Sequence, residues 1–64
     1  MRVNKDPLLT EKETAEEIDV RPQTLARWRM LKEGPPFTRI GRNIRYRRTL
    51  LDAWLDKQTV QTVD

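Results

Sequence analysis

The 64-residue sequence predicts one small domain, mainly α-helical with a single β-hairpin. Three observations support this. Apolar residues recur at helical spacing in three segments, Gly34-Pro35-Pro36 ends the second segment, and a Gly41-Arg42-Asn43 turn separates two short runs of β-branched and aromatic residues. Because the chain has neither Cys nor His, disulfides and a zinc site are excluded, and packing and helix caps must stabilise the fold.

The first helix is expected over residues 11–18, after a flexible lead at residues 1–7. Thr10 and Glu13 have the spacing of a capping box, in which each side chain binds the backbone N–H of the other residue. Asp19 follows the helix and is expected in a turn that requires a positive φ. Ala15 and Ile18 should be buried, and a helix this short must dock against another element.

A second helix is expected over residues 22–32, with Pro22 at its first position, where a missing N–H does no harm. Leu25, Trp28 and Lys32 share one face of this helix. Leu25 and Trp28 are predicted core residues. The opposite face carries Gln23, Ala26, Arg27 and Met30.

The hairpin is expected to pair residues 37–40 with residues 44–47, with Ile44 and Tyr46 on one side. A third helix should start near Thr49, which begins a weak T-x-x-D cap, and a flexible tail should occupy residues 58–64. The buried stripe of this third helix is predicted to be Leu51, Trp54 and Leu55.

Positive charge is concentrated in the middle of the chain. Residues 21–48 carry nine basic side chains, eight of them Arg, against Glu33 alone, so their net charge is +8. Residues 1–20 carry −3 and residues 49–64 carry −2. Because Arg is favoured for bidentate recognition of phosphate and guanine, this distribution indicates nucleic-acid binding.

Helix, tight turn, helix, hairpin and helix is the order of a minimal winged helix-turn-helix. Residues 8–57 resemble the excisionase and AlpA-type family of phage and mobile-element DNA-binding proteins, and they are also similar to the reading head of MerR-type regulators. Asp19 stands where that family usually has Gly, and Arg21 stands where it often has Ser. The motifs that carry the resemblance are Leu9-Thr10, Ala15, Leu25, Arg27-Trp28, Gly34-Pro35-Pro36-Phe37, Ile40-Gly41-Arg42, Arg45-Tyr46-Arg47-Arg48 and Leu51-Asp52-Ala53-Trp54-Leu55.

Three sets of DNA-contacting residues are predicted. The N-terminal half of the second helix should meet base edges in the major groove, where Arg pairs with guanine and Gln with adenine. The hairpin tip should act as a wing on the minor groove or the backbone, and the remaining arginines should contact phosphates. The base-reading residues are Gln23, Thr24 and Arg27, the wing residues are Arg39, Arg42, Asn43 and Arg45, and the backbone contacts are Arg21, Arg29, Arg47 and Arg48.

The resemblance implies a recombination directionality factor, which binds and bends attachment-site DNA, contacts integrase and steers it towards excision, with possible head-to-tail self-association on DNA. Leu50, which lies off the buried stripe, is a candidate for that self-contact. An AlpA-like transcriptional regulator or a small phage repressor is an open alternative, and a protein–protein adaptor is a further one. We expect no catalytic residues, metal or cofactor. We expect a cytoplasmic, nucleoid-associated protein without a membrane span, because no apolar run approaches about 20 residues.

Overall fold

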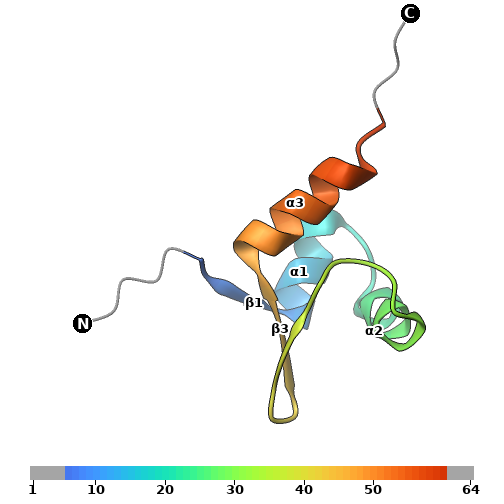
Figure 1. Ribbon diagram of the computed structural model, residues 1–64. Helices are drawn as coiled ribbons and strands as arrows, with labels where there is room; N and C mark the ends of the chain where they lie inside the picture. Colours follow the sequence, from blue (N-terminus) through green and yellow to red (C-terminus); the bar gives the residue numbers. More distant parts are fainter. Residues whose placement is uncertain (1–5, 61–64) are drawn as a thin grey trace, which may run out of the picture.

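The computed structural model describes residues 6–60, which form three helices and one antiparallel sheet (Figure 1). This architecture confirms the predicted fold class, a mainly helical winged helix-turn-helix. None of the helices in this part of the chain is long and apolar enough to cross a membrane. The elements are β1 (Leu8–Thr10), α1 (Glu11–Ile18), α2 (Pro22–Leu31), β2 (Thr38–Ile40), β3 (Asn43–Arg47) and α3 (Arg48–Gln58).

Helix α1 begins with the predicted capping box. The Glu13 N–H donates to Thr10 Oγ1 at 3.0 Å, and the Thr10 N–H donates to Glu13 Oε1 at 2.8 Å. These hydrogen bonds, led by the one from the Thr10 backbone, hold the pKa of the Glu13 carboxyl below its ordinary value. The helix ends at Asp19, whose φ of 58° is left-handed, so the predicted turn is confirmed.

Helix α2 is one residue shorter than predicted. Lys32 follows its last residue with a φ of 59°, and this left-handed backbone takes Lys32 out of the helix, away from the face of Leu25 and Trp28. Gly34, with a φ of 80°, then turns the chain directly beside the Trp28 ring.

The sheet has three strands rather than the predicted two-stranded wing. Its order is β1-β3-β2, so β3 is central and pairs with β1 as well as with its hairpin partner β2. The sequence did not predict β1, because a strand of three residues is too short to show alternation. The hairpin turn is Gly41-Arg42, with a φ of 61° at Gly41 as expected for the first position of a type II′ turn. Asn43, which was predicted to be in the turn, begins β3.

Helix α3 begins at Arg48, and the predicted Thr49 cap is wrong. The preceding residue, Arg47, makes no side-chain cap hydrogen bond. Instead, the Asp6 carboxylate accepts hydrogen bonds from the N–H and the hydroxyl of Thr49 at 2.9 and 3.0 Å. The Arg48 N–H donates to the Pro7 carbonyl at 3.0 Å. Asp6 and Pro7 are therefore part of the fold and not of a flexible lead. The rest of that lead, at 1–5, and residues 61–64 of the predicted tail lie outside the described residues. Gln58, the first residue of the predicted tail, instead belongs to α3, which extends one residue further than expected.

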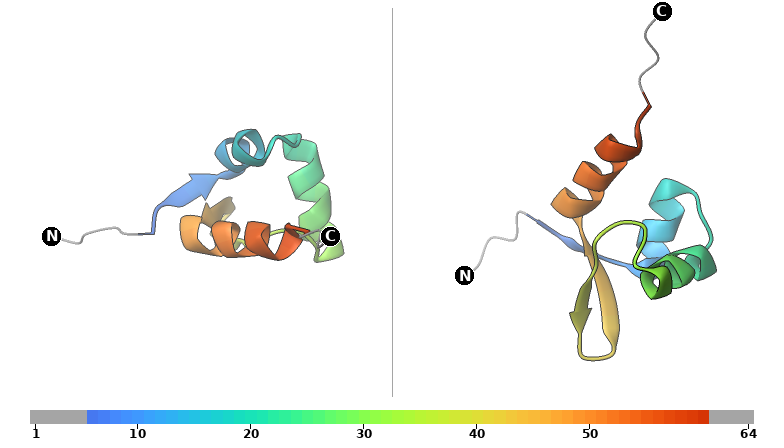
Figure 2. Two further views of the ribbon diagram at one scale, coloured as in Figure 1. Left: turned by 90° about the horizontal axis from the view of Figure 1, so that it is seen from above. Right: turned by 45° about the vertical axis from the view of Figure 1, so that its right-hand side comes forward.

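The core lies between α1, α2 and β3. Ala15, Leu25 and Tyr46 are buried there, which confirms the predicted burial of Ala15 and Leu25. Partly buried side chains surround them, including Trp28, whose ring centroid is 5.8 Å from that of Trp54 in α3. The β2–β3 hairpin projects beyond this core, and its tip and the C-terminal end of α3 lie at opposite ends of the molecule (Figures 1 and 2). The other partly buried core residues are Leu9, Ile18, Val20, Phe37 and Ile44.

Candidate nucleic-acid interface

Helix α2 is buried on one side and open to solvent on the other. Leu25 has no exposed surface, because it packs into the core. Gln23 and Arg27 lie on the opposite side, one helical turn apart, and both are exposed. Thr24, the third predicted base-reading residue, is half-buried. The structure therefore presents Gln23 and Arg27 together on the exposed face of α2 and gives Thr24 a more restricted position.

The hairpin presents its predicted wing residues on two faces. Arg42 at the turn and Asn43 beside it are exposed. Arg39 is paired with Ile44, so it lies on the side of the sheet that carries the core residues. Arg45 is paired with Thr38 on the other side, is half-buried, and donates to the carbonyl of Ile44 at 2.8 Å. Arg39 and Arg45 therefore point to opposite sides of the wing, a separation that the sequence pattern did not predict.

Three of the four arginines predicted to contact the DNA backbone form ion pairs within the protein. Arg48 binds Glu17 at 2.5 Å and Asp52 at 2.8 Å, and these hydrogen bonds, with Asp52 contributing most, hold the pKa of Arg48 above its ordinary value. Arg47 lies 3.7 Å from Asp6, and Arg29 pairs with Glu11. Phosphate binding by these three residues stays a prediction, and it would have to compete with internal carboxylates.

Arg29 connects α2 to three other parts of the fold. Its guanidinium pairs with Glu11 of α1 and lies 5.9 Å from the centroid of the Phe37 ring, which leads into β2. It also lies beside the Tyr46 hydroxyl of β3. Burial raises the pKa of that hydroxyl, and Arg29 offsets part of the rise. Since only 20% of the Arg29 side chain is exposed, its main visible role is to orient α2.

The remaining arginines of the interface have no carboxylate partner among residues 6–60. Arg21 is exposed just before α2, where it makes no side-chain cap hydrogen bond. Arg27 lies on the exposed face of α2, and Arg39 and Arg42 lie on the hairpin. Helix α2 and the hairpin therefore each present exposed guanidinium groups that have no carboxylate partner among the described residues 6–60, and such groups attract anions.

The comparison with family models identifies the kind of domain that carries these arginines. A model described as a helix-turn-helix domain matches residues 8–59. The chain belongs to this helix-turn-helix family. The match covers every element from β1 to α3 and supports a DNA-binding function for the domain. No curated protein and no solved structure matched the chain significantly.

Met30 and Lys32, at the C-terminal end of α2, are exposed and were not among the predicted site residues. Met30 continues the exposed face of α2 beyond Arg27 and is 85% exposed. Its position opposite Leu25 on the helical wheel could have predicted its exposure, but an apolar side chain does not suggest a polar contact with DNA. Lys32 is exposed after α2, although the wheel placed it with Leu25. No local signal could have placed it, because the left-handed backbone at Lys32 breaks the helical periodicity.

Proposed function

We propose that this helix-turn-helix domain is a sequence-selective reader of duplex DNA that acts as an excisionase. In this proposal α2 enters the major groove and the hairpin contacts the neighbouring minor groove or backbone. The observation that carries it is that Arg27 on the open face of α2 and Arg42 at the hairpin turn are both exposed. Neither guanidinium has a carboxylate partner within residues 6–60, so both are available to DNA.

The excisionase role adds a specific consequence of binding. The chain would occupy adjacent copies of its site in an attachment region, bend the duplex and contact integrase, which would then favour excision. Support comes from the resemblance of residues 8–57 to excisionase and AlpA-type proteins and from the match to the helix-turn-helix family. A single module of this size buries roughly 600–1,000 Å² on DNA, so we expect modest affinity alone and cooperative filling of tandem sites.

Two substitutions separate base reading from backbone contact. Arg27→Ala should cost about 1–3 kcal/mol on the specific site and reduce sequence preference, because one base contact is lost. Arg42→Ala should weaken specific and random duplexes by similar factors. Lys57→Ala, near the C-terminal end of α3, is the matched control and should change neither. If both arginine variants lose affinity equally on the two duplexes, α2 does not read sequence.

The salt dependence of binding tests the electrostatic contribution. With roughly five phosphate contacts, the logarithm of the association constant should fall with the logarithm of salt concentration with a slope of about −4 to −5. Titrations of wild-type protein from low to physiological salt give this slope directly. A curve without salt dependence, or no duplex binding at all, would favour the protein–protein adaptor.

Excision and regulation differ in what binding causes. Addition of the purified protein to integrase and attachment-site DNA should increase the excised product, and Arg27→Ala should abolish that increase. A footprint over several evenly spaced sites in the attachment region should accompany it. An AlpA-like regulator or small repressor would instead protect a promoter, alter transcription from it and leave the recombination products unchanged.

A further inference from the structure

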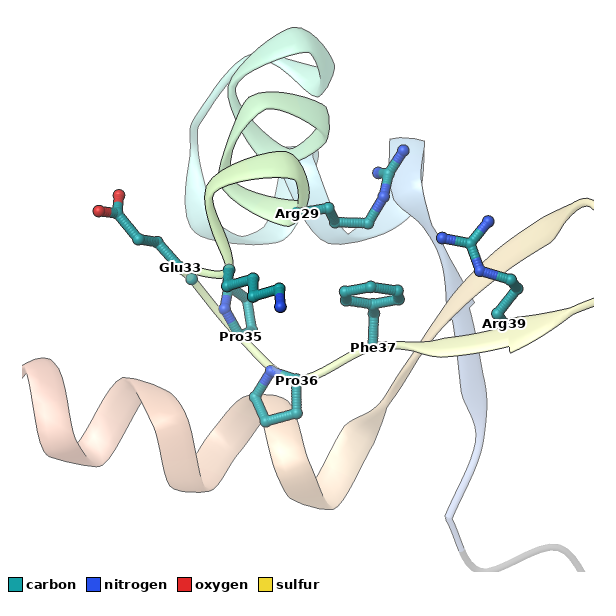
Figure 3. A pocket seen from close by; sticks show the side chains of 8 residues that line it. Arg29, Glu33, Pro35, Pro36, Phe37 and Arg39 are labelled. Carbon is teal, nitrogen blue, oxygen red and sulfur yellow. The ribbon is translucent and has the colours of Figure 1, made fainter.

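A cavity of about 520 Å³ lies between the C-terminal end of α2 and the start of β2 (Figure 3). Phe37 is at its centre, with Arg29 above the ring and Arg39 beside it in that view. Each guanidinium carbon is 5.9 Å from the ring centroid. Tyr46 packs against Phe37 with the ring centroids 6.5 Å apart, so the core fixes the position of the ring. The cavity therefore combines an apolar floor with cationic walls.

The charges around this cavity are not balanced. Arg29 is paired with Glu11 and contributes little free charge. Lys32 and Arg39 are exposed and have no carboxylate partner among residues 6–60. Glu33 is the only acidic residue of the lining, and its side chain points away from Phe37 (Figure 3). Two uncompensated cations thus flank a hydrophobic surface, a combination suited to an anion with an apolar neighbour.

The backbone at Lys32 also indicates a role for its side chain. Its φ of 59° is a conformation that glycine adopts without steric cost and that other residues adopt rarely. The helix C-cap would therefore be more stable with glycine at this position. A lysine there is unfavourable for the fold alone, and Lys32 is one of the residues that line the cavity.

We infer that this cavity is the binding site of one DNA phosphodiester group. Lys32 and Arg39 bind the phosphate, and the neighbouring deoxyribose packs against Phe37. The inference rests on the proposed function. If α2 occupies the major groove and the wing contacts the next minor groove, the strand that separates the two grooves must pass between α2 and the hairpin. The cavity lies between these elements. Its cations fit the phosphate oxygens, and its apolar floor fits the sugar.

The decisive variant is Lys32→Gly, because it acts on folding and on binding in opposite directions. Glycine suits the left-handed backbone, so the melting temperature of the variant should equal or exceed that of the wild type. Its DNA affinity should nevertheless fall by about tenfold, the loss expected for one charge-assisted contact. The salt slope should become shallower by about 0.9, the value for one phosphate. Lys57→Ala should leave affinity and slope unchanged.

Site-specific neutral phosphates identify the contact. A series of duplexes, each with a single methylphosphonate, is titrated with wild-type protein, Lys32→Gly and Arg39→Ala. One position should weaken wild-type binding by about tenfold and have almost no further effect on either variant. If Lys32→Gly binds every duplex as the wild type does while Arg27→Ala stays defective, the proposed phosphate site is wrong and the DNA-reading proposal survives. If Arg27→Ala also binds normally, both proposals fail.

Discussion

Gly34 is the position where a single methyl group should do the most damage. A Cβ added there would lie 2.7 Å from Trp28 Cε3 and 3.1 Å from Trp28 Cβ, and the φ of Gly34 is 80°. The Trp28 ring cannot easily retreat, because it packs against Trp54. Gly41 is a matched control, since its φ is 61° but no atom lies within 4 Å of its added Cβ.

The two alanine variants should therefore differ by the cost of the contact alone. The left-handed backbone costs each variant about 1 kcal/mol. The overlap with Trp28 should add about 1–3 kcal/mol at Gly34. A domain of this length has a total stability of roughly 3–10 kcal/mol, so Gly34→Ala could remove most of it. At about 4–8 °C per kcal/mol, Gly41→Ala should lower the melting temperature by about 4–8 °C and Gly34→Ala by at least twice as much.

Thermal unfolding followed by far-UV circular dichroism measures both effects, and Trp fluorescence reports the contact itself. Gly34→Ala should change the emission of the folded protein, because Trp28 must move, whereas Gly41→Ala should not. Equal shifts in melting temperature for the two variants would refute the steric reasoning. They would mean that the ring relaxes without cost and that only the backbone conformation matters.

Three further outcomes follow from the caps and the ion pair. Thr10→Ala removes a capping-box acceptor and should cost about 1 kcal/mol, measured by urea unfolding. The hydrogen bond from the Thr49 backbone N–H lowers the pKa of Asp6, and the hydrogen bond from the Thr10 backbone N–H lowers the pKa of Glu13. Both carboxylates therefore stabilise the folded state above the ordinary carboxyl pKa, and this contribution is lost as the pH falls through their lowered pKa values in the folded protein. Melting temperatures at pH 7 and pH 3 should show this loss, and Asp6→Asn should reduce it. Glu11→Gln should cost about 1 kcal/mol, since it leaves Arg29 without its partner, and calorimetry would show no change if that ion pair were negligible.

The sequence predicted those parts of the fold whose signals lie within a few residues of one another. The capping box joins Thr10 and Glu13, three positions apart, so both ends of the interaction are visible in one short segment. The α3 cap is different, because Asp6 and Thr49 are 43 positions apart. No local pattern connects them, and the nearer Thr49–Asp52 spacing suggested the wrong cap. Strand β1 was missed because its three residues are too few to show alternation and its hydrogen-bonding partner, β3, is distant in the sequence.

The candidate site also has features that the local sequence predicted and features that depend on contacts formed only on folding. Helical periodicity placed Gln23 and Arg27 opposite Leu25, and the structure agrees. Charge counting, however, treated every arginine of the basic segment as available to DNA. Whether a guanidinium is available depends on which carboxylate lies beside it after folding. The Glu11–Arg29 and Glu17–Arg48 pairs each join two elements, so the sequence alone could not separate structural arginines from DNA-facing ones.

The difference between arginines that form internal ion pairs and arginines that do not decides how binding data on this domain must be interpreted. Removing Arg27 or Arg42 deletes a cation with no carboxylate partner among residues 6–60, so a loss of affinity reports contact with DNA. Removing Arg29 leaves Glu11 unpaired against α2 and withdraws a cation from the Phe37 ring, so affinity would fall even if Arg29 never contacted a phosphate. The two causes are separable because a contact changes the salt slope, whereas a displaced helix lowers affinity at every salt concentration and lowers the melting temperature as well.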